Sequence, residues 1–174
     1  MSFSPSPLER LNRARGDLRM GLPVVLTTPE GAALVVATES LNAARLAGLR
    51  ALGEPLVLAL TGHRARTLKA RAYDGDVARV ILPAEAGLGW IEALADPADD
   101  LRVPMKGPLQ TQRDGPADLH RAAIRLAKAA QLLPAALVAQ TPQALGLAAG
   151  HGLTVLDAAE TQTLDTSLSP VIAA

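Results

Sequence analysis

The chain has 174 residues, of which 49% are apolar but only 2% aromatic, and it contains no cysteine. Its seventeen basic residues balance its seventeen acidic ones, so it lacks the positive field that non-specific binding to nucleic acid or an anionic membrane needs. The absence of cysteine excludes disulfides, zinc–thiolate sites and cysteine nucleophiles.

A single domain is expected over residues 1–174, with a core of Ala, Val, Leu and Ile. Residues 1–7 and 167–174 are expected to form flexible tails, and whether Ala174 is a natural end stays open. The first tail precedes charged residues and not the apolar stretch of a signal peptide. No run approaches the roughly 20 apolar residues that span a bilayer. We therefore expect a cytoplasmic protein with neither a membrane nor a nucleic-acid partner.

The first half of the chain predicts two longer helices around a hairpin. Apolar positions recur at helical spacing up to Met20, and Gly21 follows where a helix tolerates positive φ. Ser40 or Asn42 can cap the second helix, and Thr61 a short third one. The expected elements are helix 8–20, strands 22–27 and 33–37 around a turn at 28–31, helix 41–53, strand 56–60 and a short helix at 61–68.

The second half alternates strands and helices around one irregular segment. Pro, Gly and charged residues are dense between 96 and 116, and loops of this length are often functional. The expected elements are strand 77–82, helix 88–95, amphipathic helix 117–130, strand 135–140, helix 142–150, strand 153–156 and a final helical turn capped by Asp157. This alternation predicts an α/β layered fold.

Three stretches carry a family resemblance through their order and spacing. They are Gly21–Leu26 leading to Ala37-Thr38-Glu39, then Leu58–Thr61 followed by Arg64, Arg66 and Leu68, and last Ala122–Ala136 with His151-Gly152-Leu153 nearby. Together they resemble the 3,4-dihydroxy-2-butanone-4-phosphate synthase family, which rearranges ribulose 5-phosphate in riboflavin biosynthesis. The resemblance implies a three-layer αβα domain with a mixed, twisted sheet, and a homodimer.

The reaction of that family needs groups that this sequence lacks. The family's acidic loop is reduced to residues 27–33, where Glu30 is the surviving carboxylate, and residues 81–87 bring no threonine pair. Leu119, His120 and Arg121 stand where the family has His, Thr and Glu, although a shift of one residue returns His120 to the metal position. Gln140 occupies the position of a late catalytic Glu in the family pattern. We expect no synthase activity, no catalytic residue, no metal and no cofactor.

Six residues remain as site candidates, each with a simpler interpretation beside it. Glu30, Glu39, His120 and Gln140 are candidates for a residual pocket, although Glu39 can instead cap the following helix and His120 can be a solvated surface residue. His63 and Arg64 are candidates for anion binding, although a plain solvent-exposed turn is the simpler interpretation.

Two kinds of function stay open. The short acid-free loop resembles degenerate synthase-like domains found ahead of GTP cyclohydrolase II, whose cysteine-containing zinc segment a chain without cysteine cannot carry. The leading hypothesis is therefore a structural, dimerising or regulatory module beside a GTP cyclohydrolase II domain. The alternative is a small enzyme or a ligand-sensing domain that acts on a sugar phosphate or a nucleotide through a remodelled pocket. P-loop, GxGxxG, GxSxG and HExxH motifs are absent.

Overall fold

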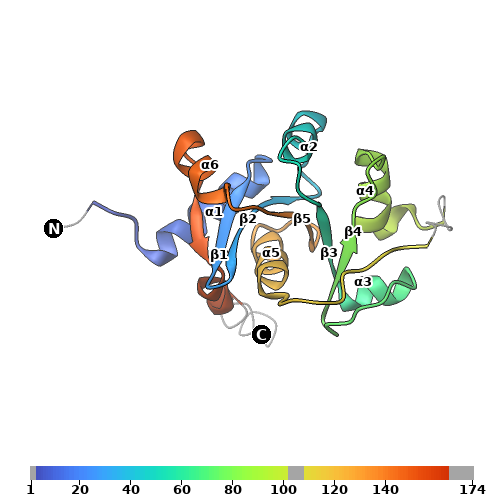
Figure 1. Cartoon of the computed structure of the whole chain (residues 1–174). Helices are drawn as coiled ribbons and strands as arrows, with labels where there is room; N and C mark the ends of the chain where they lie inside the picture. The colour runs from blue at the N-terminus through green and yellow to red at the C-terminus, as the bar shows by residue number, and fades with distance from the viewer. Residues whose placement is uncertain (1–2, 102–107, 165–174) are drawn as a thin grey trace.

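A six-stranded mixed sheet with helices on both faces forms the body of the protein (Figure 1). The structure is a computed structural model and describes residues 3–101 and 108–164. Its elements, in chain order, are α1 (Pro7–Arg19), β1 (Val24–Thr28), β2 (Gly31–Ala37), α2 (Ala43–Arg50), β3 (Val57–Thr61), α3 (Gly62–Thr67), β4 (Val77–Ile81), α4 (Leu88–Ala95), η1 (Pro97–Asp99), α5 (Asp118–Ala129), β5 (Ala135–Gln140), α6 (Ala144–His151), β6 (Val155–Asp157) and η2 (Ala158–Thr161).

The strands lie in the order β4-β3-β5-β2-β1-β6, and among these described strands only the β1–β6 pair is parallel. β1 and β2 form the expected hairpin, in which Thr28 pairs with Gly31, so the turn between them is just two residues long. β5 lies between β3 and β2 and is buried from Ala135 to Ala139, as its unbroken apolar run predicts. In this register Gln140 pairs with Ala33, beside the hairpin turn.

Two large hydrophobic clusters fill most of the space between the sheet and its helices, and a small third one lies at α3. One large cluster contains the buried faces of α1 and α5, and the other contains those of α2, α4 and α6 on the opposite face. Their fully buried apolar residues are Ala, Val, Leu and Ile, which confirms the aliphatic core and the three-layer architecture expected from the sequence. Among the described residues, no helix combines the length and apolar character that crossing a membrane requires.

The termini of the helices follow the capping signals in the sequence. Asn42, and not Ser40, caps α2 through a bond from the Arg45 amide, and Thr61 caps α3. Ser6 and Glu9 form a capping box at α1, so Ser6 is fixed and Pro7 is helical, inside the segment expected as a tail. The second expected tail, 167–174, lies outside the described residues.

Part of the segment expected to be irregular, 96–116, pairs with the edge strand β4. Thr111 bridges to Val80, the Ile81 amide donates to the Gln110 carbonyl at 2.8 Å, and the Gln112 amide donates to the Arg79 carbonyl at 2.6 Å. Backbone groups alone make these bonds, and the sequence here has no alternation of apolar and polar side chains that would predict a strand. The chain is thereby guided along the edge of β4 to the start of α5.

Candidate functional site

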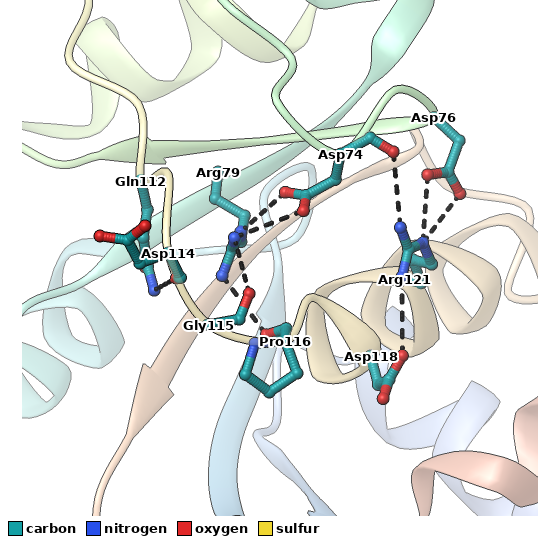
Figure 2. A network of polar contacts seen from close by, with 9 residues as sticks. All are labelled: Asp74, Asp76, Arg79, Gln112, Asp114, Gly115, Pro116, Asp118 and Arg121. Atoms are coloured by element: carbon teal, nitrogen blue, oxygen red, sulfur yellow. Dashed lines mark hydrogen bonds and ion pairs between the residues drawn. The ribbon is translucent and has the colours of Figure 1, made fainter.

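Charged side chains gather where α5 begins (Figure 2). Arg121 lies in the first turns of α5 and its Nε is 3.0 Å from Oδ2 of Asp76, in the loop before β4. Its Nη1 is 3.5 Å from Oδ1 of Asp118, three residues earlier on the helix. The Arg121 and Asp76 side chains keep 30% and 64% of their exposure, so this part of the site faces water.

A second arginine, Arg79, lies at the centre of β4 with a side chain that is fully buried. Its Nε is 3.0 Å from Oδ2 of Asp74, Nη2 donates to the Gly115 carbonyl at 3.0 Å and Nη1 to the Pro116 carbonyl at 3.3 Å (Figure 2). A buried guanidinium needs such partners because its desolvation is otherwise uncompensated. The contacts fasten the loop before β4 and the segment before α5 to the sheet.

His120 lies beside these arginines but faces the core. Its side chain is fully buried, and neither ring nitrogen has a hydrogen-bond partner among the residues that the structure describes. Burial, and then the positive charges of Arg79 and Arg121, lower the pKa of His120 from 6.5 to about 4. The imidazole is therefore neutral at neutral pH.

The solvent side of this region is a small cavity of about 120 Å³. Its lining comes from the hairpin turn at Thr28 and Pro29, the first turns of α5 and the η2 segment. The charged lining residues are two cations and two anions: Arg121, Arg125, Asp118 and Asp157. The cavity offers an anionic ligand both attraction and repulsion, and it is small for an organic substrate.

The structure brings some of the expected pocket residues together and separates others. Glu30 and Gln140 are exposed at the same end of the sheet, where the hairpin turn approaches α5. Glu39 lies beyond the opposite end of β2, about 20 Å along the strand from that turn. Its Oε1 accepts a bond from the Leu133 amide at 3.0 Å. His120 approaches the region but points into the core, so the expectation of a solvated side chain is wrong.

The expected anion site at His63 and Arg64 is occupied by internal contacts. Arg64 is 8% exposed, which corrects the expectation of an exposed turn at this position. Its guanidinium donates to the Leu94 and Ala93 carbonyls at the end of α4 and makes two bonds to the Asp100 carboxylate, at 2.7 and 2.8 Å. The backbone amide of Arg64 donates a hydrogen bond to the Thr61 side-chain oxygen. His63 alone is exposed, so Arg64 serves to hold α3 to α4.

The polar network around Arg79 and Asp74 was not among the residues expected from the sequence. One signal was present, because an arginine at the centre of the strand Val77–Ile81 stands among apolar neighbours. Such a residue needs a partner in the fold. The identity of that partner depends on tertiary packing, since Asp74, Gly115 and Pro116 come from two separate loops.

Comparisons with known proteins agree with this fold. No family model matches the sequence. A solved two-domain 3,4-dihydroxy-2-butanone 4-phosphate synthase from A. baumannii superposes with a TM-score of 0.64 and 15% identity, over 87% of this chain and 56% of that one. Another solved synthase, in complex with two magnesium ions, superposes with a TM-score of 0.59 and 14% identity, over 86% of this chain and 93% of that one. The chain has the dihydroxybutanone-phosphate synthase fold.

A sequence relative shows a further similarity, beside that of the fold. A GTP cyclohydrolase-2 from Azospirillum brasilense is 33% identical over 153 aligned residues, and the match covers 86% of this chain and 39% of the relative. The chain thus spans about two fifths of the length of this curated relative. The resemblance to synthase-like domains that accompany GTP cyclohydrolase II, noted in the sequence, is confirmed by these two findings together.

Proposed function

We propose that this chain is a non-catalytic, synthase-like module that serves a GTP cyclohydrolase II as a structural, dimerising or regulatory domain. The observation that carries the proposal is Arg121. It stands where the synthase pattern has a glutamate, and its guanidinium is bonded to Asp76 and Asp118. A guanidinium in this position cannot accept a proton as a carboxylate does, and its charge repels the divalent cation that stabilises the negative charge of an enediolate.

The residues around α5 do not fit the divalent metal that the synthase fold implies. No group of three or more His, Cys, Asp or Glu side chains that could hold a metal ion occurs within residues 3–101 and 108–164. His120 is the remaining candidate ligand, but its nitrogens are buried beside two guanidinium groups. Divalent cations such as Mg²⁺ require several oxygen ligands, and a positive neighbourhood repels them. The start of α5 is therefore a poor environment for a divalent cation.

Two other positions support the loss of synthase chemistry. The two-residue turn between Thr28 and Gly31 leaves no room for an acidic loop, and Glu30 is exposed at its tip. Gln140 has the shape of a glutamate at the end of β5, but a carboxamide cannot accept a proton near neutral pH. The scaffold therefore keeps the strands and helices of the fold without a carboxylate at the end of β5.

The link to GTP cyclohydrolase II rests on the matched relative. The similar region is about two fifths of that protein, so more than half of the relative has no counterpart in this chain. The synthase resemblance also implies a homodimer. A dimer at micromolar concentration in sedimentation velocity supports the dimerising role, and a monomer throughout that range contradicts it.

Metal titration tests the loss of the catalytic centre. Calorimetric titration of the chain with Mg²⁺ and Mn²⁺ is expected to show no saturable binding. A one-site isotherm that disappears in His120→Ala, with circular dichroism unchanged, would overturn the proposal. Asp157→Asn is the matched control, because Asp157 lines the nearby cavity but stands in no position of the synthase metal pattern.

A second candidate function is the binding of a sugar phosphate or a nucleotide, either for sensing or for different chemistry. The observation in its favour is the cavity at α5, where Arg121 and Arg125 face the turn at Thr28. Thermal denaturation with ribulose 5-phosphate, GTP or a flavin tests it, since a ligand bound by the folded state raises the melting temperature. A shift that is lost in Arg125→Gln supports this function, and no shift with any of the three excludes it.

A further inference from the structure

An apolar groove lies on the face of the sheet opposite α5. It has a volume of about 400 Å³ and runs between α2 and α6, which stand apart in Figure 1. Leu34 and Leu49 form its floor, Gly48 lies on its α2 side and Leu147 on its α6 side. A volume of this size accommodates a small ligand or a large side chain with its neighbours.

The charges around the groove are turned away from it or lie at its margin. Arg45 lines one side, but its Nη1 donates to the Gly21 carbonyl at 3.1 Å. Arg50, the other arginine of α2, donates to the Pro83 and Ala86 carbonyls. The lining contains no carboxylate, and His151 is its other titratable residue. The groove therefore favours an uncharged, apolar occupant.

An apolar side chain without a partner exists elsewhere in this chain. Phe3, the single phenylalanine of the sequence, is 95% exposed. It lies on a short arm, residues 3–6, that carries no charged side chain. An aromatic side chain buries more apolar area on association than most others, so leaving it in water is unfavourable.

The direction of the arm is fixed at its base. Arg10 Nη1 donates to the Pro5 carbonyl at 2.9 Å, and the capping box of Ser6 and Glu9 holds the next residue. Pro5 and Pro7 restrict φ on either side of Ser6. The arm thus leads outward, away from α2 and α6 (Figure 1). A groove on a second copy has no such restriction.

We propose that the Phe3 arm of one copy occupies the α2–α6 groove of a second copy. The Phe3 side chain and the leucine-lined part of the groove are both apolar, and reciprocal exchange of two arms closes an isologous dimer. This inference rests on the proposed dimerising function and names a surface for it. Two arms bury less area than a standard stable interface, so the dimer is expected to form at micromolar or higher concentration.

Sedimentation equilibrium with four variants tests the exchange. Phe3→Ser is expected to raise the dimer dissociation constant by about tenfold or more for each of the two arms. Gly48→Arg should do the same by filling the groove, and it should fold because a Cβ at Gly48 meets nothing within 4 Å. The double variant should be no weaker than the worse single variant, because both changes break one contact. Leu101→Ser is the matched control, since Leu101 is 97% exposed and belongs to no part of the groove.

The outcomes separate this inference from the function on which it rests. A dimer whose affinity is unchanged in Phe3→Ser, or additive losses in the double variant, overturns the arm exchange and leaves dimerisation standing. A monomer at every concentration overturns both. Loss of affinity in Leu101→Ser equal to that in Phe3→Ser also overturns the exchange, because the effect would then come from any exposed apolar residue.

Discussion

Replacing Asp74 by asparagine removes the counter-charge of a buried cation. The Arg79 side chain is fully buried and that of Asp74 is 18% exposed, so water cannot take over the role of the carboxylate. Removing one partner of a buried ion pair destabilises a fold by about 3–5 kcal/mol. Arg79 keeps its bonds to the Gly115 and Pro116 carbonyls, which places the expected loss for Asp74→Asn at the lower end, about 3 kcal/mol.

Asp76→Asn is the matched control, because it breaks an Arg–Asp pair only two residues away. The Arg121 and Asp76 side chains are 30% and 64% exposed, and exposed pairs contribute less than about 1 kcal/mol. Urea unfolding followed by circular dichroism gives both values as shifts of the midpoint at constant slope. Equal losses in the two variants would contradict the role given to burial. The double variant Asp74→Asn with Arg79→Met should recover much of the stability, since it leaves no buried charge.

Three further variants probe the packing around the site and the helices. His120→Leu should match or exceed the wild type in stability at pH 7, because it removes two buried nitrogens without partners. The pKa of His120 is about 4 in the folded state and 6.5 in its ordinary state, so between these pH values the unfolded state binds one more proton than the folded state. As the pH falls from 6.5 to 4, the wild type should therefore lose up to about 3 kcal/mol of unfolding free energy relative to His120→Leu. Equal pH profiles in urea unfolding would contradict this. Gly62→Ala should destabilise the fold strongly, because its Cβ would lie 2.2 Å from the Gly75 carbonyl oxygen. Gly48→Ala, in the middle of α2 where a Cβ meets nothing within 4 Å, should stabilise the fold by about 0.5–1 kcal/mol. A lower melting temperature for Gly48→Ala than for Gly62→Ala would contradict both predictions.

The scaffold was largely predictable because its signals are local. The apolar run Ala135–Gln140 gives a buried strand, and Asn42 and Thr61 begin helices by accepting bonds from amides three residues ahead. The order of the strands and the pairing of residues 110–112 with β4 were not predictable in this way. They depend on backbone contacts between distant segments, which composition does not record.

The candidate site was predicted only in part, because it is assembled from tertiary contacts. Glu30 and Gln140 do lie at one end of the sheet, because β5 pairs with β2 and this brings Gln140 beside Ala33. Glu39 follows β2, and the length of that strand carries it away from the turn. His120 is polar and lies in the first turn of a helix, yet it faces inward because α5 packs that side on the sheet. Arg79 and Asp74 were missed because their pairing joins a strand to a loop.

Formate release is the direct measure of whether this synthase fold has lost synthase chemistry. The chain, in excess over ribulose 5-phosphate and with Mg²⁺ present, is incubated at pH 7 so that even a single turnover is detected. We expect no formate above the protein-free blank, because Arg121 replaces a carboxylate and is bonded to Asp76. Formate in proportion to the protein, lost in a folded His120→Ala variant, would contradict the proposed loss of catalysis.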